Sequence, residues 1–480
     1  MNERGPLAAL AEVAPRHGHA WLVGGAVRDS LLGRGTPDFD LAVQGDVRGL
    51  AREFGRRAGG HAFQLSDEFG AWRVRSHDQD WQVDLTPLTG DTLEQDLRRR
   101  DLTINAIARE LEPEGAQLID PCGGVADLQA GRLRSVGSES FSADPLRVLR
   151  LARLAAELGF TAERDTLRLA AHSAPSLSAV AAERVFAELR RLLASERAVA
   201  GLELAQRVGA TAAVLPELDA LHGVKQSDYH HLDVYDHTLA TLQAAIDLQT
   251  DPAATFGELA PALLAVLEEP LANEFTRGQA LRLGALLHDI AKPLTYVRGP
   301  EGRPTFFEHD VRGAELATGI LTRLRAGERL TLHTAALTRH HLRLGFLVHE
   351  RPLSARAVYR YLATCEPVEV DVTVLSVADR LATRGRNAER AVALHLELAR
   401  EMLADALRWR RNRPRPPSAG DVLARALGIV PGPRLGRLLA ELTEAAYAGE
   451  VDSDESVLAY ARVWLAEDSA AAAPRQSSDR

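Results

Sequence analysis

Short apolar runs alternate with amphipathic stretches over the first 140 residues, which predicts a head of mixed strands and helices. Runs rich in Trp, Val, Phe and Leu are typical of strands. The predicted strands are WLVGG (21–25), DFDLAV (38–43), AWRVRS (71–76), WQVDLTPL (81–88) and AQLID (116–120). Predicted helices or helix flanks lie between them: AVRDSLLG (26–33), DVRGLAREFGRRAGG (46–60) and LEQDLRRRDLTINAIA (93–108). Elements in this order suggest one modest sheet with flanking helices.

From about Asp144 the pattern becomes almost wholly helical. PLRVLRLARLAAELGF (145–160) and LSAVAAERVFAELRRLLAS (177–195) place apolar residues at helical spacing. RWRRNRPRPPSAG (408–420) interrupts the helices and predicts a linker. We therefore expect an α+β fold, with a small sheet-containing head followed by helical parts. The predicted parts are a head (1–143), a helical neck (144–222), a histidine-rich domain (223–407), a helical tail (408–466) and a disordered end (467–480).

Composition is that of an ordinary globular protein, with 46% hydrophobic and 26% charged residues in 480. No apolar run reaches the roughly 20 residues of a membrane span, and no secretory signal is evident at the start. The two cysteines lack metal-ligand spacing, which favours a reducing, cytoplasmic setting. A net charge of −9 argues against a wholly basic nucleic-acid binder but allows a local basic groove.

Two aspartates stand one residue apart in the predicted strand DFDLAV. Residues two apart on a strand share a face, so Asp38 and Asp40 would project side by side. Adjacent carboxylates repel one another unless a cation lies between them. Mg²⁺ suits them because it takes oxygen ligands and leaves room for substrate phosphates. Asp84 would supply a third carboxylate, and such a set can hold two metal ions.

Gly24 and Gly25 precede the predicted helix that carries Arg28. Glycines let the backbone approach a phosphate, and a helix N-terminus attracts anions. Each feature alone is more often structural, since Gly-Gly is commonly a tight turn and Asp38 could be a loop acid after Pro37. Their combination favours a phosphate site beside a metal.

LVGGAVRDSLLG (22–33) followed by DFDLAV resembles the head motif of the class II tRNA nucleotidyltransferases and bacterial poly(A) polymerases. Further motifs in the family's order are RRRDLTINAIA (98–108), DPCGGVADLQAGRLRSV (120–136), DPLRVLRLARLAAELGF (144–160) and AAERVFAELRRLL (181–193). LGIVPGPRLGRLLAEL (427–442) is similar to the tRNA-binding tail of some members.

This resemblance implies a nucleotidyltransferase that adds CMP or AMP to tRNA 3′ ends without a nucleic-acid template. Asp38 and Asp40 would then bind Mg²⁺, with Asp84 as the third catalytic carboxylate. The implied nucleotide-binding residues are Gly24, Gly25, Arg28, Arg100, Asn105, Asp144, Arg147, Arg150 and Arg153. Asp144 and Arg147 would read the base edge, since a carboxylate accepts hydrogen bonds and a guanidinium donates them. Relatives usually carry Glu where this chain has Ala143.

The segment between VDLTPL and the second motif is short, because TGDTLEQDLRRRD follows at once. In the family that the chain resembles, the absence of a longer loop between these two segments is associated with enzymes that add only CC. We therefore expect a CC-adding enzyme that uses CTP and leaves the last A to a separate A-adding enzyme. A full CCA-adding enzyme, an A-adding enzyme using ATP, a poly(A) polymerase and an inactive RNA-binding protein are the alternatives. The short tail PRQSSDR disfavours the poly(A) polymerase.

A second candidate site lies in the histidine-rich region. LLHDIAKP (286–293) carries adjacent His288 and Asp289, with His237 upstream and Asp379 downstream. This order resembles the HD phosphohydrolase superfamily and implies a metal-dependent hydrolase of phosphoesters. Imidazoles with carboxylates suit Mn²⁺, Ni²⁺, Fe²⁺ or Mg²⁺. His309, with His340 or His341, would complete a second metal site; scattered core histidines are the alternative.

Overall fold

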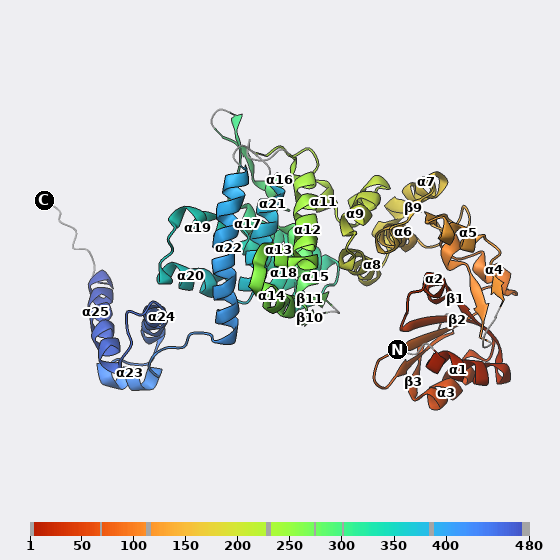
Figure 1. Ribbon diagram of the computed structural model, residues 1–480, viewed down its shortest axis with the longest axis horizontal. Coiled ribbons are helices and arrows are strands. Elements are labelled where there is room, and N and C mark those ends of the chain that lie inside the picture. Colours follow the sequence, from red (N-terminus) through yellow and green to blue (C-terminus); the bar gives the residue numbers. More distant parts are fainter. Residues whose placement is uncertain are drawn as a thin grey trace. The chain divides into compact units, whose positions relative to one another are not determined.

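The computed structural model describes residues 4–67, 70–111, 117–226, 232–272, 275–299, 302–383 and 388–472. These residues form two compact units, 1–216 and 217–480 (Figure 1).

The first unit contains a seven-stranded sheet in the order β3-β4-β5-β2-β1-β6-β7. Its strands are β1 (Gly18–Val23), β2 (Asp38–Gly45), β3 (Gly60–Ser66), β4 (Ala71–Ser76), β5 (Gln82–Pro87), β6 (Ala108–Glu110) and β7 (Leu118–Ile119). Strand β2 runs parallel to β5 and antiparallel to β1. The three central strands therefore bring residues 38–43 beside residues 82–87.

Apolar side chains cover both faces of this sheet. On one face, helix α1 (Arg4–Val13) and helix α3 (Val47–Ala58) contribute Leu10, Leu50 and Phe54 to a core with the sheet residues Val74 and Val83. On the other face, helix α4 (Leu93–Leu97) packs apolar residues against β1, β2 and β6. The sheet is thus held rigidly, which fixes the carboxylates on β2.

Two further helices of the head are α2 (Gly25–Leu31) and α5 (Gly124–Gln129). The helices that follow the head in the first unit are α6 (Leu146–Leu158), α7 (Arg164–Ser173), α8 (Ala182–Ala194), α9 (Ala198–Arg207) and α10 (Ala210–Val214) (Figure 1). A short parallel pair joins β8 (Arg132–Leu133) to β9 (Thr161–Ala162). Helix α6 packs on α8 and α9.

The second unit is helical, with two short hairpins, β10 (Pro270–Ala272) with β11 (Phe275–Thr276) and β12 (Tyr296–Arg298) with β13 (Pro304–Phe306). Its helices include α11 (Pro216–Asp219), α12 (Val234–Thr250), α13 (Pro252–Phe256), α14 (Ala260–Leu267), α15 (Arg277–Leu287), α16 (Lys292–Thr295), α17 (His309–Arg323), α18 (Glu328–His340), α19 (Arg343–Leu347), α20 (Ala355–Cys365), α21 (Glu369–Ala382), α22 (Ala388–Arg411), α23 (Gly420–Leu427), α24 (Pro433–Tyr447) and α25 (Asp454–Ala472). Among the helices that the structure describes, none combines the length and hydrophobicity that a bilayer crossing requires.

The α+β fold with a small sheet in the head is confirmed. Several predicted boundaries are wrong. Strands β3 and β6 were not predicted; each overlaps a predicted helical segment only at its first residue, Gly60 or Ala108, and each forms by antiparallel pairing, with β4 and with β1 respectively. Helix α22 continues through Arg411, so the linker begins later than residue 408. Helix α25 reaches Ala472, so residues 467–472 are helical; residues 473–480 lie outside the described residues.

Candidate functional site

A cleft of about 960 Å³ lies in the first unit, lined by residues of the head and of helices α6 and α8. Asp38 and Asp40, the first and third residues of strand β2, line this cleft. Asp84 lies beside Asp40 across the β2–β5 pair. Both carboxylate oxygens of Asp84 accept hydrogen bonds from Arg73, at 2.6 and 2.7 Å. The structure thus brings the three aspartates together but gives Asp84 a cationic partner that the sequence did not reveal.

Gly24 lines the cleft close to Asp40. Its backbone φ of 72° is in the left-handed region that favours glycine. A Cβ there would lie 3.1 Å from Arg100 Nη1 and 3.5 Å from Asp40 Oδ2, so these three residues converge. Burial raises the pKa of Asp40, Arg100 opposes the rise, and the charges of Asp84 and Asp38 add to it. An ionised Asp40 therefore favours a neighbouring cation, and this carboxylate pair fits a divalent metal with oxygen ligands.

A network of hydrogen bonds holds Arg28, which lies in the middle of helix α2. Arg28 donates to both oxygens of Asp29 at 2.9 Å and to Asn105 Oδ1 at 2.7 Å. Asn105 donates in turn to Asp101 Oδ1 at 3.0 Å. Burial would raise the pKa of Asp101, but Arg150 and these hydrogen bonds outweigh it and lower that pKa to about 2. These hydrogen bonds fix the Arg28 guanidinium beside Gly25 in the cleft.

The predicted base-reading pair is only partly in the cleft. Arg147 lines it, donates to the Ser140 carbonyl at 3.0 Å, and has a buried Nε with no hydrogen-bond partner among the described residues. Burial lowers the pKa of Arg147. Asp144 Oδ2 instead accepts a hydrogen bond from Arg184 at 2.8 Å. Of the two neighbouring residues 143 and 144, the cleft is lined by Ala143.

Arg150 and Arg153 line the cleft but are held by carboxylates. Arg150 contacts Asp101 at 3.1 Å and Glu188 at 3.3 Å. Arg153 contacts Glu188 and Glu157, both at 2.6 Å. Their stripe along α6 therefore joins α6 to the second motif and to α8.

Sequence reasoning missed other cleft residues. They include Thr36, Thr89, Asp96, Arg99, Glu188 and Arg191. Arg99 stands next to the predicted Arg100 in the RRRD run, which was the available signal. Arg191 lies on α8, and nothing in the local pattern separates it from a solvated arginine of an amphipathic helix.

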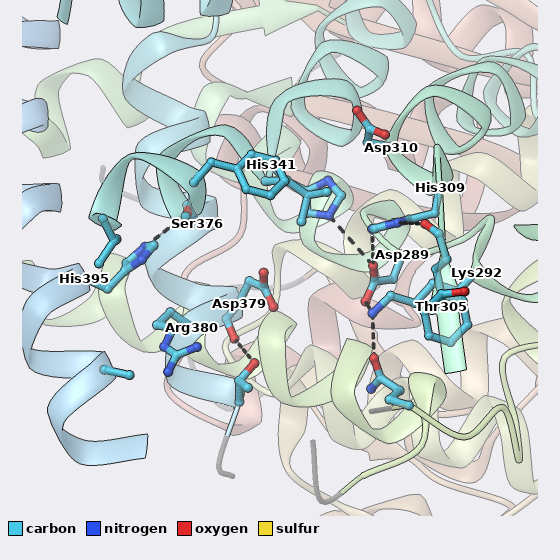
Figure 2. Close-up of a pocket in the computed structure, with 18 of the residues that line it drawn as sticks. Asp289, Lys292, Thr305, His309, Asp310, His341, Ser376, Asp379, Arg380 and His395 are labelled. Atoms are coloured by element: carbon cyan, nitrogen blue, oxygen red, sulfur yellow. Dashed lines mark hydrogen bonds and ion pairs between the residues drawn. The ribbon is translucent and has the colours of Figure 1, made fainter. Parts of the chain in front are cut away.

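The second candidate site lies in the second unit, where a cluster of histidines and aspartates meets a pocket of about 720 Å³ (Figure 2). His237, His288 and Asp289 form one group whose ligand atoms lie within 4.8 Å of one another. Asp289, His309 and His341 form a second group on the same criterion. The remaining predicted ligand is Asp379, whose Oδ1 lies 3.0 Å from His237 Nε2.

Backbone carbonyls orient three of these imidazoles. The Nδ1 atoms of His288, His309 and His341 lie 2.8, 2.7 and 2.7 Å from the carbonyls of Ala285, Phe306 and Thr338. A carbonyl can only accept, so each Nδ1 donates its proton there, and Nε2 is the ring atom left for a metal, which would displace any proton that it carries. Metal-binding histidines are commonly oriented in this way, and the cluster therefore fits a divalent metal.

Charges within the cluster are strongly coupled. Burial opposes ionisation of Asp289, but His288 and Lys292 outweigh it and hold the pKa of Asp289 well below its usual range. Lys292 Nζ lies 2.6 Å from Asp289 Oδ2, a contact that sequence reasoning did not single out although the residue stands in HDIAKP. Burial, together with the charge of His288, lowers the pKa of His341 to about 4, so its ring is neutral at pH 7.

The sequence left open whether His340 or His341 belongs to the second group, and the structure distinguishes these two adjacent histidines. His341 joins the cluster, whereas His340 Nδ1 accepts a hydrogen bond from Arg343 at 3.0 Å. Burial and Arg343 lower the pKa of His340 to about 4.

Three family models match the chain in the order that the motifs predicted. The poly A polymerase head domain matches residues 20–134. A probable RNA- and SrmB-binding site of polymerase A matches residues 159–221. The HD domain matches residues 234–384.

Relatives with similar sequences are named for the addition of different nucleotides. The chain is 36% identical over 454 residues to the A-adding tRNA nucleotidyltransferase of Deinococcus radiodurans, covering 93% of this chain and 96% of that protein. It is 36% identical over 451 residues to the CC-adding tRNA nucleotidyltransferase of Thermus thermophilus, covering 93% of each. It is 36% identical over 365 residues to a multifunctional CCA protein of Xanthomonas campestris pv. campestris, covering 72% of this chain and 80% of that protein.

Solved structures share the fold. An apo form of a CCA-adding enzyme has a TM-score of 0.64 at 20% identity and covers 95% of this chain and 93% of that one. The Thermotoga maritima CCA-adding enzyme complexed with tRNA has a TM-score of 0.61 at 20% identity and covers 96% and 94%. With the relatives above, these matches show that the chain is an enzyme of the tRNA nucleotidyltransferase family and carries an HD domain after its head.

Proposed function

We propose that the chain adds CC to the 3′ end of tRNA, with CTP as the nucleotide and Mg²⁺ in the head. The observation that carries this proposal is the short connection from β5 to α4. Thr89 N donates to Asp96 at 3.0 Å and Asp91 N donates to Gln95 at 2.8 Å, while Thr92 caps α4. These hydrogen bonds restrict the conformation of the connection along its length. It therefore has little freedom to change the shape of the cleft for ATP.

In the proposed reaction, the tRNA 3′-oxygen forms a bond to the α-phosphorus, and the bond to the leaving pyrophosphate breaks. Asp38 and Asp40 would hold Mg²⁺, which supplies activation of the hydroxyl and neutralisation of the leaving group. Asp84 would join them only by releasing Arg73, so we assign it as a neighbouring charge that strengthens the demand for a cation.

Phosphate and base recognition would fall to residues around the same cleft. The backbone at Gly24 and Gly25, with Arg28 and Arg100, would hold the triphosphate. Arg147 would donate to the base edge through its guanidinium, whose Nε has no hydrogen-bond partner among the described residues. Asp144 would have to turn away from Arg184 to accept from the base. Asn105, Arg150 and Arg153 would keep these groups in place through their contacts with Arg28, Asp101 and Glu188.

The HD cluster supports a second activity, metal-dependent hydrolysis of phosphoesters. His237, His288, Asp289 and Asp379 would hold one metal, and His309 and His341 would complete a second site around Asp289. The metal would be Mn²⁺, Ni²⁺ or Mg²⁺, and a bound metal would activate water. Loss of hydrolysis in the double variant His288→Ala/Asp289→Ala, with nucleotide transfer intact, would support this assignment; unchanged hydrolysis would contradict it.

An extension assay tests the nucleotidyltransferase proposal. Transcripts of tRNA ending at the discriminator base, at C and at CC are incubated with CTP, ATP or both. We expect two C residues to be added and no A on the CC-ended transcript, which would require a separate A-adding enzyme in the same cytoplasm. Full CCA would show that the short connection does not limit nucleotide choice. Long A tracts on unrelated RNA would indicate a poly(A) polymerase.

A-adding activity is the second candidate, because the relative from Deinococcus radiodurans is named for it and matches almost the full chain. It predicts A addition to the CC-ended transcript alone and no use of CTP. The same assay separates it from CC addition.

A further inference from the structure

The pocket beside the HD cluster has a second wall that the metal-binding residues do not form. Helices α21 and α22 provide it, with lining residues that include Ser376, Arg380, Thr383, Leu394 and His395. Leu394 and His395 lie beyond residues 234–384, which match the HD domain model. Figure 2 shows Arg380 next to Asp379, on the side of the pocket where Ser376 and His395 lie. A substrate bound at the metal cluster would therefore meet this wall.

Arg380 is an unusual arginine in this unit. Arg351 pairs with Glu397 and Glu401, and Arg410 with Glu269. Arg380 is partly buried and lines the pocket, yet its Nε is buried with no hydrogen-bond partner among the residues that the structure describes. A buried donor without a partner costs free energy, which a bound acceptor would recover.

The neighbours of Arg380 on this wall leave its charge available. His395 is buried, and its Nε2 lies 3.1 Å from Ser376 Oγ, which fixes the ring. Burial lowers the pKa of His395 to about 4, so the ring adds no positive charge at pH 7. The adjacent Asp379 is directed at His237, 3.0 Å away. Arg380 is thus the one permanent cation among the described residues that line this wall.

We propose that Arg380 binds the phosphoryl group of the HD substrate and makes the site selective for phosphomonoesters over phosphodiesters. This inference rests on the hydrolase activity proposed above. A guanidinium pairs best with two oxygens at once. A phosphomonoester has three non-bridging oxygens, so one can face the metal cluster while two accept hydrogen bonds from the Arg380 guanidinium. A phosphodiester has two non-bridging oxygens, so only one remains for the guanidinium when the other faces the metal cluster.

Full-length, Mn²⁺-loaded protein tests the proposal with p-nitrophenyl phosphate as the monoester and bis-p-nitrophenyl phosphate as the diester. Arg380→Met should lower kcat/KM for the monoester by roughly 10- to 100-fold, mostly through KM, and should lower it for the diester by no more than about threefold. Arg380→Lys should fall between, because it keeps the charge and loses the fork. An equal loss on both substrates would show a merely structural role and overturn the proposal, as would no loss on either.

Arg312→Met is the matched control, because Arg312 is an exposed arginine of the same unit that pairs with Glu315 outside the pocket. Circular dichroism and Mn²⁺ binding check that each variant is folded, because nucleotide transfer reports on the first unit and Arg380 lies in the second. If the wild-type protein hydrolyses neither ester, the hydrolase proposal fails, and binding of inorganic phosphate to the Mn²⁺-loaded protein decides the role of Arg380. Calorimetry should then show roughly tenfold weaker binding in Arg380→Met. Equal affinity, or no phosphate binding by the wild type, would overturn the inference.

Discussion

Asp101→Asn is expected to loosen the segment that holds Arg28 at the cleft. Asp101 is 4% exposed and accepts hydrogen bonds from Asn105 Nδ2 at 3.0 Å and from the Leu102 amide at 2.7 Å. Its other oxygen lies 3.1 Å from Arg150 Nη1. An asparagine can keep one acceptor for Asn105 and Leu102, but its amide nitrogen would then face the Arg150 donor. The substitution therefore removes one charge pair and sets two donors against each other.

The size of the effect follows from the ionisation of Asp101. Its pKa is about 2 in the fold, against an ordinary value of 3.8, so the folded state favours the charged form. This difference corresponds to about 2 kcal/mol of stability at neutral pH. Because the folded pKa is the lower one, the contribution is complete above about pH 5 and is lost as the pH falls toward 2. It should have fallen to about 1 kcal/mol at pH 3.

Hydrogen exchange measured by mass spectrometry is a suitable assay, because two compact units make a single unfolding free energy hard to define. Peptides from residues 98–110 should exchange roughly 30-fold faster in Asp101→Asn at pH 7, after correction for intrinsic rates, with peptides of the second unit unchanged. The gap between variant and wild type should narrow at pH 3. A gap that stays constant or widens on acidification would refute the reasoning, and so would equal exchange at pH 7.

Further changes probe both sites. Asp40→Asn should abolish nucleotide transfer while tRNA binding measured by filter retention stays within about twofold, since the carboxylate is assigned to the metal and not to the RNA. His341→Ala should weaken Mn²⁺ binding, measured by calorimetry, roughly tenfold or more at the group formed with His309, whereas His340→Ala, its control outside the cluster, should leave Mn²⁺ binding unchanged. Gly124→Ala should lower the melting temperature and raise KM for CTP. A Cβ at this position would lie 2.1 Å from the Thr103 carbonyl oxygen and displace the segment that carries Asn105. A melting temperature and a KM equal to those of the wild type would contradict this packing argument. Removal of divalent metal by a chelator should stop both transfer and hydrolysis, and a metal-free preparation that retains either activity would contradict the metal assignment.

The sequence was most informative where the deciding geometry is local. The two-residue repeat of a strand predicts that Asp38 and Asp40 share a face, and both line the cleft. Arg73 was not predictable in this way. It meets Asp84 only because β4 pairs antiparallel with β5 and sets these two residues opposite each other. A register between strands depends on the whole sheet, so a local pattern does not contain it.

The arginines of α6 show the same limit. Spacing of three places Arg147, Arg150 and Arg153 along one stripe, and all three line the cleft. Spacing does not show which carboxylates fold back onto the stripe. Glu188 comes from α8 and holds both Arg150 and Arg153, so two of the three predicted nucleotide ligands are already paired. Arg147, with its unpartnered Nε, is the one left to meet a base.

In the HD domain, the linear order of His237, His288, Asp289 and Asp379 was sufficient to predict a cluster, but it could not choose between His340 and His341. These neighbours differ by about 100° around helix α18, so only one can face Asp289. The choice depends on where α18 ends, because the Nδ1 of the selected histidine bonds the Thr338 carbonyl in the last turn. Both ligand groups share Asp289. Loss of that one carboxylate would therefore disable both groups, whereas loss of His341 would spare the group formed with His237.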